Sequence, residues 1–141
     1  MKKLILIVLA FSFLLTFTAC DGTSDNDDDA KSRVKTTAFA SMKTTLTNDG
    51  YELTPRTQEN FTYYEGKVST DYSIDVKITG WEIGYVNSTE RWVEIYEFDT
   101  TADAKEYFDA LTDEASQGRL LIHDEYVVLV TYSQETIDLF N

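Results

Sequence analysis

The stretch Arg91–Leu111, RWVEIYEFDTTADAKEYFDAL, joins a predicted strand to a predicted helix and decides the fold class. In its first eight residues both alternating sets of side chains are largely apolar, which predicts a strand covered on both faces. Thr100 then precedes Asp103 by three residues, much as in a helix capping box, and Gly118 is expected to close the helix. The apolar stripe of this helix comprises Ala104, Tyr107, Phe108, Leu111 and Ala115.

A second strand is predicted upstream of this stretch. Apolar and polar residues alternate over 72–79, which is typical of a strand with one face in water. Gly80 shifts the phase of the alternation, which then continues to Tyr85, so we expect a β-bulge or a bend at Gly80. Residues 87–90 are expected to form the turn into the next strand.

The remaining elements lie on either side of these two strands. Apolar residues spaced four apart predict a first helix: Val34, Ala38, Met42 and Leu46. Gly50 is suited to end that helix, and Asn60–Tyr64 is expected to form another strand. Residues 120–122 and 126–132 predict a hairpin, after which Ser133 is placed to cap a short final helix.

Together these elements predict an α+β domain. We expect a mainly antiparallel sheet with about three helices packed on one of its faces. The domain is expected to run from residue 33 to residue 141, and about 110 residues is a suitable size for a single core.

The N-terminal segment 1–19 has the layout of a secretory signal peptide. Two lysines follow Met1, an apolar run extends from Leu4 to Phe17, and small residues come next. The run is shorter than the roughly 20 apolar residues that span a bilayer comfortably. An uncleaved membrane anchor is the alternative reading of the same segment.

The residues Phe17-Thr18-Ala19-Cys20 resemble the lipobox of bacterial lipoproteins. The resemblance implies that a diacylglycerol is attached to Cys20 and that the chain is cut before it. Phe17 departs from the family, which usually has an aliphatic residue there. Two acyl chains suffice for stable anchoring, so we expect a lipid-anchored protein on the outer face of the cell membrane. In a Gram-negative host, Asp21 implies retention at the inner membrane, on its periplasmic side.

The segment 20–32 is predicted to be a disordered acidic tether. It has no apolar periodicity, and its Asp, Ser, Thr and Gly residues bury too little surface to become ordered. A calcium loop is the alternative, because Asp25, Asp27 and Asp29 alternate. That alternative is weakened by Ala30 and Thr36, which stand where the loop pattern has Gly and Glu.

The charge of the chain limits its partners. Without Lys2 and Lys3, which the signal peptide carries away, 10 basic residues remain against 25 acidic ones, a net charge of −15. We expect no nucleic-acid binding, because phosphates require Lys and Arg. The same charge opposes adsorption on anionic lipid headgroups. A solvated acidic surface is the plain interpretation, and a basic partner or a cation is the functional one.

The sequence predicts neither an enzyme nor a cofactor or metal site. His123 is the only histidine and falls in a predicted turn, whereas metal sites and nucleophilic triads usually need more. Glu94 and Glu97 are expected on opposite strand faces, and Glu82 could approach one of them. A small hydrolase that uses surface carboxylates therefore remains an alternative.

A binding module is the sharper hypothesis. Trp81 and Tyr85 share one strand face, and Trp92, Glu94 and Tyr96 share another. If these strands pair in register, the aromatic side chains and the carboxylate form one surface that suits a cationic peptide or a sugar. The candidate ligand contacts are Trp81, Trp92, Glu94 and Tyr96. Cross-strand packing under a helix is the alternative for the aromatic pairs, and an accessory subunit of an envelope complex is a third function.

Overall fold

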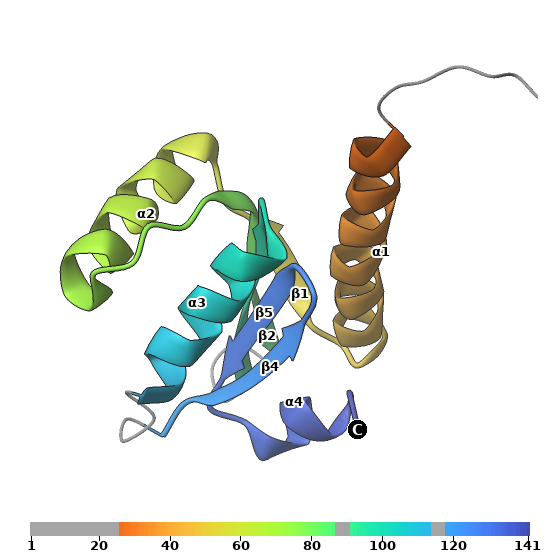
Figure 1. Ribbon diagram of the computed structural model, residues 1–141. Coiled ribbons are helices and arrows are strands. Elements are labelled where there is room, and N and C mark those ends of the chain that lie inside the picture. The colour runs from red at the N-terminus through yellow and green to blue at the C-terminus, as the bar shows by residue number, and fades with distance from the viewer. Residues whose placement is uncertain (1–25, 87–90, 114–117) are drawn as a thin grey trace, which may run out of the picture.

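The computed structural model describes residues 26–86, 91–113 and 118–141 (Figure 1). The elements in chain order are α1 (Asn26–Asn48), β1 (Glu52–Pro55), α2 (Gln58–Tyr72), β2 (Ile78–Val86), β3 (Arg91–Phe98), α3 (Thr101–Asp113), β4 (Leu120–Asp124), β5 (Val127–Thr131) and α4 (Gln134–Asp138). The predicted signal peptide, the lipid attachment at Cys20 and the turn at 87–90 lie outside the described residues.

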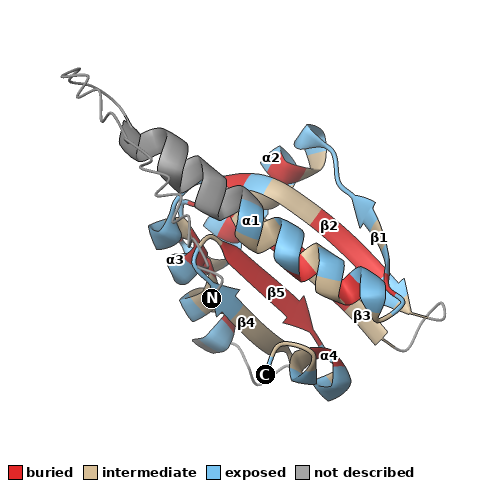
Figure 2. Cartoon of the chain, turned by 90° about the vertical axis from the view of Figure 1, so that its right-hand side faces the viewer, coloured by how far each residue is buried: buried red, intermediate tan, exposed pale blue. Residues whose placement is uncertain are grey.

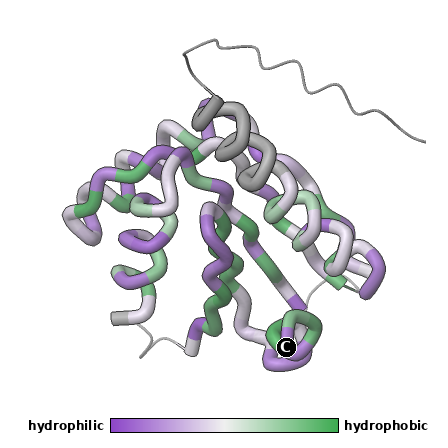
Figure 3. Tube along the Cα trace, turned by 45° about the vertical axis from the view of Figure 1, so that its right-hand side comes forward, coloured by the Kyte–Doolittle hydropathy of each residue, from purple (hydrophilic) through white to green (hydrophobic). Residues whose placement is uncertain are grey.

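The five strands form one antiparallel sheet in the order β1-β2-β3-β5-β4. This confirms the α+β class and the antiparallel sheet. Figure 3 shows hydrophobic residues along the strands, between helices on which hydrophilic residues recur. Within the described residues, none of the helices combines the length and the apolarity needed to cross a membrane.

Helices cover both faces of the sheet, and not one face as expected. The domain therefore has three layers, with the sheet between two layers of helices, and the side chains of β3 and β5 explain this arrangement. Val93 and Ile95 belong to a core cluster with Met42 and Leu46 of α1, whereas Tyr96 and its neighbours pack with α2 and α3. The short helix α4 lies on the α1 side. Because both faces of the central strands are apolar, a helix layer on each face is needed to exclude water.

Helix α2 replaces the strand predicted at Asn60–Tyr64. The helix begins after Thr57, whose backbone N–H donates to the Asn60 side chain at 3.1 Å. Phe61 and Val68 are buried seven residues apart, two turns along one helix face. The prediction was wrong because the β-prone aromatic and threonine residues at 61–64 outweighed this helical spacing.

Residues 73–77 are not paired in the sheet, although a strand was predicted from Tyr72. Their side chains do alternate, with Ile74 and Val76 buried. The Lys77 carbonyl accepts from the Asp99 N–H at 2.8 Å, just beyond β3, and two backbone amides at this end bond to carboxylates. The Glu65 side chain accepts from the Ile78 N–H at 2.8 Å, and the Asp103 side chain accepts from the Lys77 N–H at 3.0 Å. Alternating burial therefore arose without a β-ladder.

The bulge predicted at Gly80 is confirmed, because the β2–β3 register shifts between Ile78 and Gly80. The predicted N-terminal caps at Thr100 and Ser133 are also confirmed. Thr100 accepts from the Asp103 N–H at 3.0 Å, and Ser133 accepts from the Thr136 N–H at 3.3 Å.

Helix α1 begins at Asn26, so residues 26–32 of the predicted tether lie in its first turns, and residues 20–25 lie outside the described residues. The calcium-loop alternative is not supported at Asp27 and Asp29, whose backbone is helical, and Asp25 lies outside the described residues. In Figure 2 the part of α1 with described burial lies lengthwise over the strands.

Candidate functional site

The register of β2 and β3 brings the predicted aromatic and acidic residues onto one face of the sheet. The cross-strand pairs on this face are Trp81 with Tyr96, Ile83 with Glu94, and Tyr85 with Trp92. The face is the one that α2 and α3 partly cover. Because the helices cover one end more than the other, the two ends differ in exposure.

The Tyr96 end of this face is core packing. Tyr96 is 0% exposed and lies between Tyr64 of α2, with ring centroids 5.4 Å apart, and Tyr107 of α3, at 5.2 Å. Trp81 is partly buried, with its ring 5.0 Å from that of Tyr64. Tyr96 has no solvent-facing surface for a ligand, which corrects its place among the expected ligand contacts. Trp81 and Tyr96 are the packing pair of the alternative interpretation.

The other end carries exposed aromatic side chains. Tyr85 is 43% exposed and lies opposite Trp92, which is partly buried. Tyr132 is 57% exposed and stacks on Trp92 with ring centroids 5.4 Å apart. These three side chains, from β2, β3 and the end of β5, are called the aromatic row. Tyr132 was missed as a site residue because only the β3–β5 pairing places it beside Trp92.

Glu94 adjoins the aromatic row and is partly buried. Burial raises the pKa of its carboxyl group, because the charged form loses solvation. The Tyr96 hydroxyl donates to this carboxylate and, with the charges of Arg56 and Arg119, opposes that rise in pKa. Glu94 is therefore a carboxylate held in a defined position by the core below it.

A line of tyrosine hydroxyls supports Glu94 from inside the protein. The Tyr64 and Tyr107 hydroxyls are hydrogen-bonded at 2.8 Å, and Tyr96 connects the same cluster to Glu94. Burial raises the pKa of all three tyrosines, so their hydroxyl groups remain protonated donors at neutral pH. The cluster can orient the carboxylate but holds no nucleophile near it.

Two arginines that sequence reasoning missed belong to this site. Burial lowers the pKa of Arg119, but hydrogen bonds to the hydroxyls of Tyr72 and Tyr132 outweigh burial and raise it. The Arg56 guanidinium lies 5.6 Å from the centre of the Trp81 ring. Both arginines lie far from β3 in the sequence, and no local pattern points to them. They compensate the charge of Glu94 and weaken the case for a cationic ligand.

The other candidate carboxylates lie on the α1 face of the sheet. Glu82 is 7% exposed and forms an ion pair with Lys43 of α1. A groove of about 530 Å³ beside Lys43 includes Glu97 in its lining. Glu94 lies on the opposite face, so neither Glu82 nor Glu97 forms a catalytic pair with it. The ion pair fastens α1 to the sheet.

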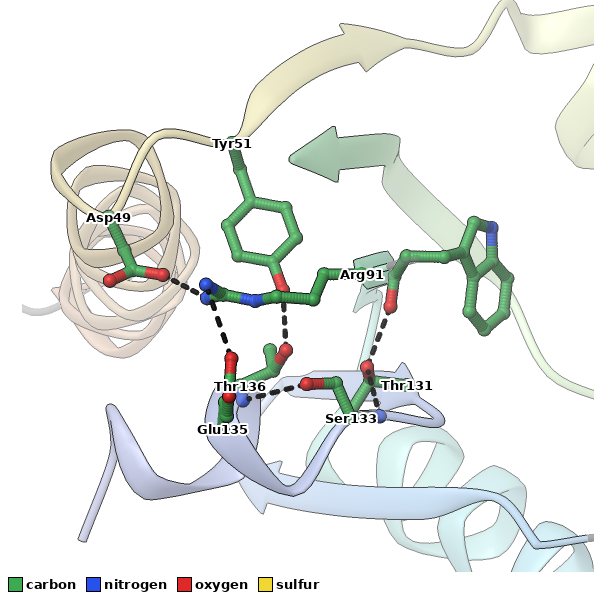
Figure 4. A network of polar contacts seen from close by, with 8 residues as sticks. Asp49, Tyr51, Arg91, Thr131, Ser133, Glu135 and Thr136 are labelled. Atoms are coloured by element: carbon green, nitrogen blue, oxygen red, sulfur yellow. Dashed lines mark hydrogen bonds and ion pairs between the residues drawn. The ribbon is translucent and has the colours of Figure 1, made fainter. Parts of the chain in front are cut away.

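A second polar network lies at the end of α1 and is structural (Figure 4). Arg91 forms ion pairs with Asp49 and, at 3.5 Å, with Glu135, and its guanidinium lies 5.3 Å from the centre of the Tyr51 ring. The Tyr51 hydroxyl bonds to the buried hydroxyl of Thr136. These contacts join α1, β3 and α4, so we assign them to holding the α1 layer together.

His123 lies at the end of β4, is exposed, and contacts the Glu125 carbonyl through Nε2 at 3.0 Å. Among the residues that the structure describes, no group of three or more His, Cys, Asp and Glu side chains is placed to hold a metal ion. The chain matches no protein-family model, no curated protein and no solved structure. The aromatic row with Glu94 is therefore the candidate site, on its geometry alone.

Proposed function

We propose that this protein is a lipid-anchored, extracytoplasmic binding module without catalytic activity. The observation that carries the binding role is the aromatic row beside a carboxylate in a fixed position. Tyr85 and Tyr132 expose large ring surfaces, and tyrosine brings contact area at a low cost in conformational entropy. Glu94 adds one hydrogen-bond acceptor whose direction Tyr96 sets.

The anchor rests on the resemblance of Phe17-Thr18-Ala19-Cys20 to a lipobox and on the signal-peptide layout before it. Its test is the mass and membrane fractionation of the protein expressed in a bacterium. We expect a mature chain that begins at Cys20 and carries diacylglycerol, and we expect Cys20→Ala to abolish both features. Trp92→Ala is the matched control, which should be processed and fractionate as wild type does. Normal processing of Cys20→Ala would refute the anchor.

The binding role predicts that the aromatic row contributes little to stability. Truncating Tyr132 to Ala should lower the free energy of unfolding by about 0.5–1.5 kcal/mol, through the loss of its stacking on Trp92. The same truncation at buried Tyr96 should cost about 3–5 kcal/mol. Urea unfolding of the two variants separates the roles, and a large loss at Tyr132 would show that the row is part of the core.

A further inference from the structure

The aromatic row lies at the opposite end of the domain from the start of α1, which follows the proposed lipid anchor in the sequence. A Cβ atom at Gly80 would lie 3.2 Å from the Phe39 ring, so the middle of α1 is beside the Gly80 end of β2. At the C-terminal end of α1, about three turns after Phe39, Asp49 forms an ion pair with Arg91 at the start of β3. Helix α1 therefore runs along the sheet, and its N-terminal end points away from the end that carries Tyr85.

Helix and strand geometry give the scale of this separation. From Phe39 back to Asn26, α1 extends for about 20 Å at 1.5 Å per residue. From Glu97 to Trp92, in the opposite direction, β3 spans about 17 Å at 3.3 Å per residue. Cys20 precedes Asn26 by a segment that can reach at most about 20 Å. With lipid on Cys20, the row is placed at the end of the domain remote from the membrane.

The chemistry of the row favours an uncharged ligand. Two carboxylates, of Glu94 and of Glu52, which pairs with Tyr85 across the β1–β2 ladder, are matched by the guanidinium groups of Arg56 and Arg119, so the row offers no net charge to a charged ligand. An anionic ligand would approach a mature chain whose 10 basic and 25 acidic residues give a net charge of −15. A pyranose ring has apolar C–H groups on its faces and hydroxyl groups around its rim. The exposed aromatic rings can contact the C–H faces of the sugar. The carboxylate, guanidinium and tyrosine hydroxyl groups beside them can form hydrogen bonds with its hydroxyl groups.

We propose that the aromatic row binds a neutral glycan that lies outside the membrane, and not the headgroups of the membrane that holds the protein. This inference rests on the proposed binding function and names its ligand class. The membrane-distal position of the row commits the ligand to the outer side, where a glycan chain can reach Tyr85, Trp92 and Tyr132 from the solvent.

The two tryptophans of the chain provide a built-in assay. Trp81→Phe leaves Trp92 in the row as the only indole, and Trp92→Phe leaves Trp81 under α2. The full lipidated chain, reconstituted in phosphatidylcholine vesicles, is titrated with cellohexaose, maltohexaose and chitohexaose. Pentalysine and polygalacturonate are the charged comparisons.

We expect at least one neutral hexasaccharide to shift the emission of Trp92 and to leave that of Trp81 unchanged. In the Trp81→Phe background, Tyr132→Ala should weaken this binding about tenfold, the effect of losing one aromatic anchor. Tyr63→Ala is the matched control, because Tyr63 is 75% exposed on α2 outside the row. Nitroxide-labelled lipid headgroups should leave the Trp92 emission unchanged.

Each of the other possible outcomes would refute a different part of the proposal. A Trp92 response to pentalysine or polygalacturonate alone would refute the glycan and keep the binding function. A response of Trp81 alone would refute the row as the binding surface, and the proposed function with it. Quenching of Trp92 by labelled headgroups would refute the membrane-distal placement. An unchanged Trp92 emission with all three neutral hexasaccharides would refute the glycan inference.

Discussion

Gly84 of β2 offers a quantitative test of how the edge strand β1 packs on the sheet. A Cβ atom at this position would lie 2.5 Å from Cδ2 of Leu53, 3.2 Å from Cγ1 of Val93 and 3.4 Å from Cδ1 of Tyr51. Because non-bonded carbons prefer about 3.5–4.0 Å, Leu53 must retreat by about 1 Å or more in Gly84→Ala. We expect the variant to lose stability through this displacement.

The magnitude follows from two opposed terms. Overpacking costs about 1–3 kcal/mol, and replacing a strand glycine by alanine returns about 0.5–1 kcal/mol. Gly84→Ala should therefore lower the free energy of unfolding by about 1–2 kcal/mol. In a Leu53→Ala background the nearest clash is gone, so the same substitution should be neutral or slightly stabilising. The expected coupling between the two positions is then about 1–2 kcal/mol.

Urea unfolding followed by tryptophan fluorescence measures all four members of this cycle. Gly66→Ala is the matched control, because a Cβ at this exposed position of α2 would meet nothing within 4 Å. It should raise the free energy of unfolding by about 0.5–1 kcal/mol, the helix preference for alanine over glycine. An equal cost of Gly84→Ala with and without Leu53 would refute the packing argument.

Three further predictions concern the site and the α1 layer. Burial raises the pKa of Glu94 in the folded state. The wild type should therefore lose stability relative to Glu94→Gln as the pH rises above about 4.3, the pKa of a glutamate in the unfolded chain. A difference in unfolding free energy that stays constant between pH 3 and 8 would contradict this. Tyr51→Phe removes a buried hydrogen bond to Thr136 and should cost about 1–2 kcal/mol in urea unfolding. Ser133→Ala removes the cap of α4, should cost about 1 kcal/mol, and should speed hydrogen exchange at the Thr136 amide.

Local patterns predicted the parts of the fold that depend on local chemistry. Thr100 and Ser133 were recognised as caps because a cap is set by residues within one turn. Strand β3, which is apolar on both faces, was predicted correctly because the alternation of its side chains between the two faces can be read from consecutive residues. The same pattern also required helices on both faces, a consequence that the one-face expectation missed. Helix α2 was hidden because Phe61 is followed by Thr62, Tyr63 and Tyr64, residue types that favour strands.

The candidate site was only partly predictable, because its composition depends on pairing. Trp92 and Glu94 were named from one strand, and both lie at or beside the exposed row. The burial of Tyr96 depends on where α2 and α3 pack, which no single strand reveals. Tyr132 and Arg119 reach the row from the β4–β5 side of the sheet, so their roles appear only in three dimensions.

The bulge at Gly80 makes the length of β2 as important as its residue types. Ile78 and Trp81 are three residues apart yet both belong to the α2–α3 face, because the bulge adds one residue to the strand. Deleting one residue here would move the side chains of the rest of β2 to the opposite face of the sheet. Trp81 and Tyr85 would face α1, and Glu82 would lie among the aromatic rings. We therefore expect natural variation at this point to substitute residues without changing their number.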